Sequence, residues 1–282
     1  MIELRGVTVR LSGRSYGTWG GYRGYRSYRK TKVHRGDFAL EDLNLRVDNE
    51  KVIVLGPNGS GKTTILRAIS GLIPYSGSIL INGHEVRSIR NFLGYSTNLP
   101  EAYQIGITAE DIAYIYEELK GLDMELFHEI IDALNLEEEV LRRPLYALSA
   151  GQSVLVRTAL ALASRPEIYG LDEPFENVDP ARRHVIAMYI KEIGREGIMV
   201  THEVDMLSEF RHYKVYFLLS GKLQGPVKVA DLLESSIVEG ERGDAIIVLD
   251  VMGKKVSLVK GDVGMKFSYL GSLNRIYGVV AQ

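Results

Sequence analysis

The fold is decided by the stretch Gly56-Pro57-Asn58-Gly59-Ser60-Gly61-Lys62-Thr63. An apolar run from Lys51 to Leu55 precedes it and predicts a short buried strand, while Thr63 to Ser70 predicts a helix. A strand, a glycine-rich turn and a helix in this order form a phosphate-binding loop, because the turn points successive backbone N–H groups at phosphate oxygens. Gly59 and Gly61 are expected to be the least replaceable positions, since a Cβ atom there would obstruct the phosphates.

The loop and the start of its helix carry the groups that a bound triphosphate needs. The positive end of the helix favours an anion, and the Lys62 ammonium is expected to reach the β and γ phosphates. The Thr63 hydroxyl is expected to bind Mg²⁺, and Thr64 to contact the α phosphate. The predicted nucleotide-binding residues of this segment are Gly56, Pro57, Asn58, Gly59, Ser60, Gly61, Lys62, Thr63 and Thr64.

Two other predicted strands end in groups that can act on a phosphate. The mostly apolar run from Ile168 to Leu171 predicts a strand that delivers the carboxylates of Asp172 and Glu173 at its end. His202 follows a predicted strand, Ile198 to Val200, and an imidazole can donate a hydrogen bond or a proton near neutral pH. The non-functional alternatives are an acidic pair in a plain turn for Asp172 and Glu173, and a surface or core histidine for His202.

The run Leu148-Ser149-Ala150-Gly151-Gln152 predicts a second anion site. Ser149 is a suitable N-cap for a predicted helix from Ala150 to Ser164, so its hydroxyl and the free N–H groups behind it can face an anion. Without the phosphate-binding loop upstream, the same residues would indicate only the start of a helix.

Taken in order, these motifs resemble those of ABC (ATP-binding cassette) transporter ATP-binding subunits, members of the P-loop NTPase superfamily. The resemblance covers residues 1 to about 225 and implies ATP and Mg²⁺ as ligands. It implies that Asp172 holds Mg²⁺ through water, that Glu173 polarises the attacking water, and that His202 contacts the γ phosphate. Together with Lys62, Glu173 and His202 are then the expected catalytic residues.

The resemblance also implies an assembly. Two copies, or a copy and a related chain, form a head-to-tail homodimer or pseudodimer in which Ser149, Gly151 and Gln152 of one copy cover the ATP held by the other. Val178-Asp179 stands where the family places a loop that touches this partner. A separate membrane-spanning transporter subunit is the other implied partner, and the expected location is cytoplasmic, peripheral on the inner face of the cell membrane.

Three positions depart from the family pattern. Ala150 replaces the first of two usual glycines in the signature run, and Gly170 interrupts a strand, where glycine indicates a close approach of backbone. Asn98 stands in place of a glutamine that ligates Mg²⁺ in the family. Because asparagine is one methylene shorter, metal contact by Asn98 would need a shifted loop or a bridging water.

The order of predicted elements gives the fold class. Strands and helices alternate, which predicts an α/β protein with a mostly parallel sheet, an antiparallel β subdomain and a helical subdomain over about 98–150. The ATP-binding domain is expected over residues 1–225, followed by a small β-rich domain over 226–282. Alternating strands are predicted from Ile2 to Leu11, with one slip at Gly6, and from Phe38 to Val47.

Between those strands lies a stretch, 12–36, rich in arginine, tyrosine and glycine and without an acidic residue. Tyr16, Trp19 or another of its aromatic residues could stack on adenine, and Phe38 is a weaker candidate. Arginines interleaved with aromatic rings can also bind nucleic acid, so a non-transport ATPase acting on nucleic acid or a macromolecular assembly is the alternative function. A solvated loop, or a loop that covers the nucleotide or a partner subunit, would also fit this composition. The same residues could equally contact anionic lipid headgroups.

Composition excludes several other classes of protein. The 282 residues include no cysteine, which removes disulfide scaffolds, thiolate metal sites and cysteine nucleophiles, and the formal charge of -2 gives no overall attraction to polyanions. No run reaches the roughly 18 apolar residues that a membrane-spanning helix needs.

Overall fold

The computed structural model describes residues 1–10, 39–90, 92–104, 107–276 and 278. The segment 12–36, including Tyr16 and Trp19, lies outside the described residues, as does Phe38.

A six-stranded sheet forms the centre of the molecule, in the order β10-β9-β3-β8-β7-β6. All its pairings are parallel except that of β9 with β10. Its strands are β3 (Lys51–Leu55), β6 (Tyr95–Thr97), β7 (Ile168–Asp172), β8 (Glu196–Thr201), β9 (Lys214–Leu219) and β10 (Lys222–Lys228). Because parallel strands end at one edge, the polar residues after β3, β7 and β8 are brought together there.

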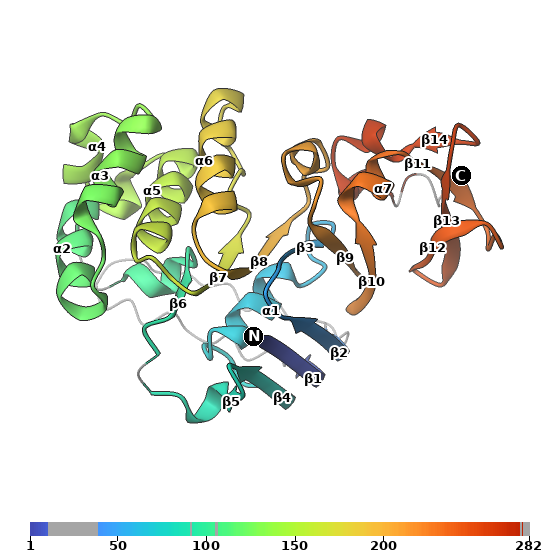
Figure 1. The fold of residues 1–282 in the computed structure, drawn as a ribbon, viewed down its shortest axis with the longest axis horizontal. Helices are drawn as coiled ribbons and strands as arrows, with labels where there is room; N and C mark the ends of the chain where they lie inside the picture. The colour runs from blue at the N-terminus through green and yellow to red at the C-terminus, as the bar shows by residue number, and fades with distance from the viewer. Residues whose placement is uncertain (11–38, 91, 105–106, 277, 279–282) are drawn as a thin grey trace, which may run out of the picture.

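The helices divide into those that pack on this sheet and those of a separate lobe. Helix α1 (Lys62–Ile69) follows β3 directly, and α6 (Pro180–Glu192) connects β7 to β8. The lobe, on the left in Figure 1, contains α2 (Ala109–Lys120), α3 (Met124–Ala133), α4 (Glu138–Arg142) and α5 (Ala150–Ala163). The expected helical subdomain is therefore present.

A second, antiparallel sheet covers α1 and has the order β2-β1-β4-β5. Its strands are β1 (Ile2–Arg10), β2 (Ala39–Val47), β4 (Ser76–Ile81) and β5 (His84–Glu85). Alternate β1 side chains are buried, and the slip in this pattern at Gly6 coincides with a shift of register between Leu4 and Val7. The slip is thus a β-bulge, which moves the later residues back into phase with the core.

The C-terminal part forms a third sheet, antiparallel and in the order β12-β13-β11-β14 (right in Figure 1). It comprises α7 (Val229–Leu233), β11 (Ser235–Glu239), β12 (Ala245–Val251), β13 (Lys254–Lys260) and β14 (Met265–Lys266). The expected boundary after Gly225 falls inside β10, which continues to Lys228. The apolar face of this sheet, with Leu249 and Val256, is continuous with the main core.

Short 3₁₀ helices also occur: η1 (Val86–Ser88), η2 (Pro100–Tyr103), η3 (Leu145–Ala147), η4 (Asp205–Phe210), η5 (Phe267–Leu270) and η6 (Leu273–Arg275). In the part of the chain that the structure describes, no helix combines the length and the apolar character needed to cross a bilayer.

Candidate functional site

The glycine-rich turn lies between the end of β3 and the start of α1, as the sequence predicts. Gly59 and Gly61 have φ angles of 79° and 101°, a left-handed conformation that strains any residue with a Cβ atom. Among the described residues, no side chain caps the first N–H groups of α1, where Gly61 is the N-cap. These donors, at the positive end of the helix, therefore remain for an anionic ligand.

Lys62 places a buried cation inside this turn. Its side chain is only 6% exposed, and Nζ donates to the carbonyl oxygens of Gly56 at 2.8 Å and Pro57 at 3.1 Å. Nζ also lies 3.0 Å from Oε1 of Glu173. Buried charges are costly unless paired, so these three oxygens stabilise the ammonium in place.

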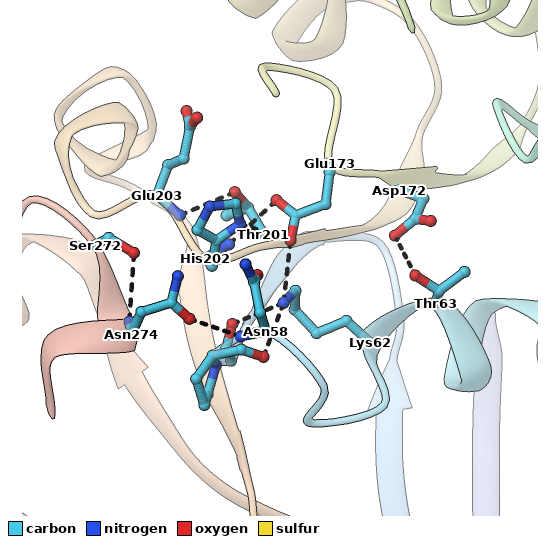
Figure 2. A network of polar contacts seen from close by, with 12 residues as sticks. Asn58, Lys62, Thr63, Asp172, Glu173, Thr201, His202, Glu203, Ser272 and Asn274 are labelled. Carbon is cyan, nitrogen blue, oxygen red and sulfur yellow. Dashed lines mark hydrogen bonds and ion pairs between the residues drawn. The ribbon is translucent and has the colours of Figure 1, made fainter. Parts of the chain in front are cut away.

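Glu173 joins the phosphate-binding loop to the end of β8. Its Oε1 lies 2.9 Å from Nδ1 of His202, and its Oε2 accepts the backbone N–H of His202 at 3.2 Å (Figure 2). The φ of Glu173 is 43°, an uncommon conformation for a residue other than glycine. The three expected catalytic residues, from three different segments, thus meet around one carboxylate.

The electrostatic surroundings favour an ionised Glu173. Burial pushes its pKa upward, but the hydrogen bond from His202 and the charge of Lys62 outweigh burial, and the net pKa is lowered. The hydrogen bond with Glu173 in turn raises the pKa of His202, despite the opposing effect of burial. At neutral pH Glu173 is therefore a carboxylate, the form that can polarise water.

Thr63 and Asp172, the predicted metal ligands, lie side by side in the structure. The Thr63 hydroxyl donates to Oδ1 of Asp172 at 3.1 Å. Burial raises the pKa of Asp172 to about 6, with the Thr63 hydrogen bond acting in the opposite direction. Within the described ranges no three His, Cys, Asp or Glu side chains cluster as a metal cage. A hydroxyl and a single carboxylate suit Mg²⁺, which usually takes its other ligands from phosphates and water.

Asn98 is buried and bonded to the backbone of β7. Its Oδ1 accepts the N–H of Asp172 at 2.7 Å, and its Nδ2 donates to the Asp172 carbonyl at 3.0 Å and to Oγ1 of Thr158 at 3.1 Å. This arrangement orients the backbone that carries Asp172 and links it to α5. The metal-binding role of Asn98 stays a prediction, and it would require Oδ1 to leave the Asp172 N–H.

Ser149 begins α5 as expected, with a reciprocal pair of hydrogen bonds. Its Oγ accepts the N–H of Gln152 at 3.2 Å, and the Gln152 side chain accepts the N–H of Ser149 at 3.1 Å. Ser149 is exposed, while Gly151 packs on the loop after β7. A Cβ on Gly151 would lie 2.3 Å from the carbonyl oxygen of Asn177. The first turn of α5 therefore packs directly against the loop that contains Asn177 and fixes its position.

A cavity of about 400 Å³ lies over these groups. The residues that line it are Asn58, Gly59, Gly61, Lys62, Thr63, Thr64, Glu173 and Glu176. Glu176 is an addition to the predicted set. A second addition is Asn274, whose Oδ1 accepts the N–H of Asn58 at 2.7 Å. No motif predicts this contact, because the two residues are 216 positions apart in the sequence.

The chain is similar to a group of known proteins. A family model described as ABC transporter matches residues 40–176. The energy-coupling factor transporter ATP-binding protein EcfA of Methanoculleus marisnigri is 32% identical over 218 residues, which cover 72% of this chain and 78% of that protein. EcfA1 of Mycoplasmopsis pulmonis is 33% identical over 231 residues, which cover 77% of this chain and 86% of that protein.

Solved structures agree with these matches. A crystal structure described as that of a cobalt transport ATP-binding protein, cbiO-2, is 66% identical, with a TM-score of 0.88 over 99% of this chain and 100% of that chain. An ATP-binding cassette bound to ADP and Pi is 21% identical, with a TM-score of 0.60 over 81% of this chain and 99% of that chain. The second likeness confirms the fold alone.

Proposed function

The chain belongs to the family of ABC transporter ATP-binding proteins, and we propose that it drives a separate membrane-spanning subunit by closing on ATP and reopening after hydrolysis. Its activity is that of an ATPase subunit of such a transporter. The relatives are named for energy-coupling factor transport and for cobalt transport. Within such a transporter, the step that this chain carries out is ATP hydrolysis. The meeting of Lys62 and His202 on the Glu173 carboxylate supports the assignment.

The roles of the three residues follow from their charges. The Lys62 ammonium exchanges its carbonyl partners for phosphate oxygens, which form stronger, charge-assisted hydrogen bonds. That exchange frees Glu173, which is ionised, to accept a hydrogen bond from the attacking water. His202 holds Glu173 in place and presents its ring to the terminal phosphate. Thr63, and Asp172 through water, would hold Mg²⁺, and the ion would supply positive charge that neutralises the phosphates.

We assign the second half of the site to another copy of the chain. Ser149 is exposed at the tip of α5, where its hydroxyl and the helix N–H groups can face the ATP of a head-to-tail partner. Gly151 and Gln152 lie in the same first turn. Because Gly151 fixes the loop at Asn177, formation of the dimer is coupled in this arrangement to the position of Glu173.

We assign the contact surface for the membrane-spanning partner to a hollow of about 620 Å³ at the C-terminal end of α1. Its apolar wall includes Leu72, Ile73 and Phe92, and Leu72 is 46% exposed. Leu72 also lines a smaller neighbouring hollow with Tyr103, next to the Asn98 segment. A short amphipathic segment of a membrane protein would bury this surface and place the chain at the inner face of the membrane.

Co-purification tests the partner. Tagged chain extracted in mild detergent should carry with it a polypeptide that contains several membrane-spanning helices. Leu72→Asp should lose that polypeptide while ATP binding persists, because the substitution places a charge in the apolar hollow. Met252→Asp is the matched control, since Met252 is 74% exposed on the C-terminal sheet. Recovery of nucleic acid in place of a membrane protein, in a salt-sensitive manner, would contradict transport and support the alternative function.

A further inference from the structure

One side chain from the last part of the chain enters the phosphate-binding loop. Asn274, in η6, accepts the backbone N–H of Asn58 through Oδ1 at 2.7 Å, and Figure 2 shows Asn58 between Asn274 and Lys62. Asn58 is exposed and lines the nucleotide cavity. An N–H that the turn can offer to a phosphate is therefore already bound by a neutral amide of the same chain.

The segment that carries Asn274 is packed against the core of the protein. Leu273 and Ile276, on either side of Asn274, are fully buried in the main core. The preceding turn is anchored by Phe267, whose ring meets Phe217 of β9 edge to face, with centroids 6.1 Å apart. The Ser272 hydroxyl accepts the N–H of Asn274 at 3.3 Å. These contacts fix the position of the backbone at Asn274 and thereby orient its side chain toward Asn58.

The same segment is also bonded to the loop of His202. The N–H of Leu273 donates to the His202 carbonyl at 2.8 Å, and the N–H of Val204 donates to the Gly271 carbonyl at 2.9 Å. Glu203 and Ser272 form an antiparallel bridge between these hydrogen bonds. A movement of the His202 loop therefore displaces the segment that carries Asn274.

We propose that Asn274 competes with the terminal phosphate of a bound nucleoside triphosphate for the Asn58 N–H, and yields this N–H to the phosphate. A phosphate oxygen carries charge and is a stronger acceptor than an amide oxygen. Asn58 directly follows Pro57, whose carbonyl oxygen accepts a hydrogen bond from the Lys62 ammonium, and this ammonium also contacts Glu173. Lys62 and Glu173 are the groups proposed to act on the terminal phosphate, so the Asn58 N–H is assigned to the same phosphate. The inference rests on the proposed function and adds a competing residue to its nucleotide site.

Two substitutions of Asn274 give opposite expected results. Asn274→Ala removes the competitor, so the affinity for a non-hydrolysable ATP analogue with Mg²⁺ should increase by about 2- to 10-fold, the worth of one neutral hydrogen bond. Asn274→Asp keeps an acceptor of the same shape but adds charge, so it binds the N–H more strongly, repels phosphate and should weaken the analogue. The affinity for ADP, which lacks the terminal phosphate, should change less in both variants.

Calorimetric titration of the full chain separates the outcomes. Ser272→Ala, which removes only the hydroxyl that supports Asn274, should shift affinity in the same direction as Asn274→Ala and by less. Tyr269→Ala, at a 76% exposed position of the same segment, should change nothing. The inference is overturned if Asn274→Ala leaves analogue affinity unchanged or weaker, or if Asn274→Asp does not weaken it. If the unsubstituted chain binds no MgATP, the proposed function fails first, and the Asn274 series is not needed to show it.

Discussion

Oε1 of Glu173 lies 3.0 Å from Nζ of Lys62, so the carboxylate expected to activate water holds the cation expected to bind the terminal phosphate. Each group neutralises the other; Lys62 is buried, and the Glu173 side chain is 13% exposed. We expect a triphosphate that binds the ammonium to release the carboxylate as well. Under the proposed function, substrate binding and readiness for hydrolysis are then two results of one exchange of partners.

Glu173→Gln should separate these two results. The amide keeps the size of the side chain but cannot accept a proton, so ATP hydrolysis should fall by about 10²- to 10⁴-fold, the usual contribution of a positioned base. ATP affinity should be retained or improved, because the charge that competes for Lys62 is gone. Phosphate release and equilibrium binding, measured on the same preparation, check both parts. Turnover at the normal rate would remove Glu173 from its role.

The close approach of Gly151 to Asn177 predicts that substitutions at Gly151 and at its neighbour Ala150 have different effects on dimerisation. Gly151→Ala places a methyl group against a backbone carbonyl that cannot rotate away, so the loop at Asn177 must shift. ATP-dependent dimerisation of the Glu173→Gln background should be lost. Ala150→Gly, the matched control, restores the family's usual residue at an exposed position and should leave dimerisation intact. Size-exclusion chromatography with light scattering distinguishes the two; equal dimerisation would contradict the packing argument.

Gly170 is explained by the hydroxyl of Tyr95. A Cβ at position 170 would lie 2.3 Å from that oxygen, which is also 3.0 Å from Oγ of Ser70. Gly170→Ala should lower the free energy of unfolding by about 1–3 kcal/mol through overpacking. In the Tyr95→Phe background the oxygen is absent, and the cost of the same substitution should be clearly smaller. Urea unfolding of all four proteins gives the coupling; additive effects would show that another contact explains the glycine.

The ionisation of Lys51, outside the nucleotide site, predicts that the free energy of unfolding depends on pH. Its ammonium donates to the carbonyl oxygens of Ile190, Lys191 and Ile193 at the end of α6. Burial lowers the pKa of Lys51 from 10.5 to about 8, against the opposing charge of Glu192. Between these pH values the unfolded chain keeps a proton that the folded chain has released. This residue therefore makes the free energy of unfolding rise with pH over that interval.

Lys51→Met removes the titrating group and should remove that rise. The difference in unfolding free energy between the unsubstituted chain and Lys51→Met should grow in favour of the former from pH 8 to pH 10.5. Parallel stability curves for the two proteins would show that the ammonium is not perturbed by its surroundings.

The parts of the site that the sequence predicts are those encoded within a few neighbouring residues. The turn at Gly61, the cap at Ser149 and the strand ending in Asp172 each depend on local spacing, and parallel strands then bring their ends to one edge. The slip at Gly6 was likewise visible as an interrupted alternation and corresponds to a bulge.

The parts that the sequence does not predict depend on contacts between distant segments. β9 (Lys214–Leu219) and β10 (Lys222–Lys228) carry little alternation, because β9 is nearly buried on both faces and β10 contains Gly225-Pro226. The bonds of Asn98 to the Asp172 backbone, and of Asn274 to Asn58, join residues far apart in the chain. No local pattern distinguishes such asparagines from ordinary surface residues.

Equilibrium binding of MgATP to the purified chain and to Lys62→Ala shows whether the turn from Gly56 to Thr63 holds the triphosphate. Lys191→Ala, at a lysine on α6 away from the cavity, controls for the loss of a positive charge. The unsubstituted chain and Lys191→Ala should bind MgATP with equal affinity, and Lys62→Ala should lose binding while its thermal unfolding remains cooperative. Equal binding by a folded Lys62→Ala protein, or no binding by the unsubstituted chain, would contradict the claim that this turn holds the triphosphate.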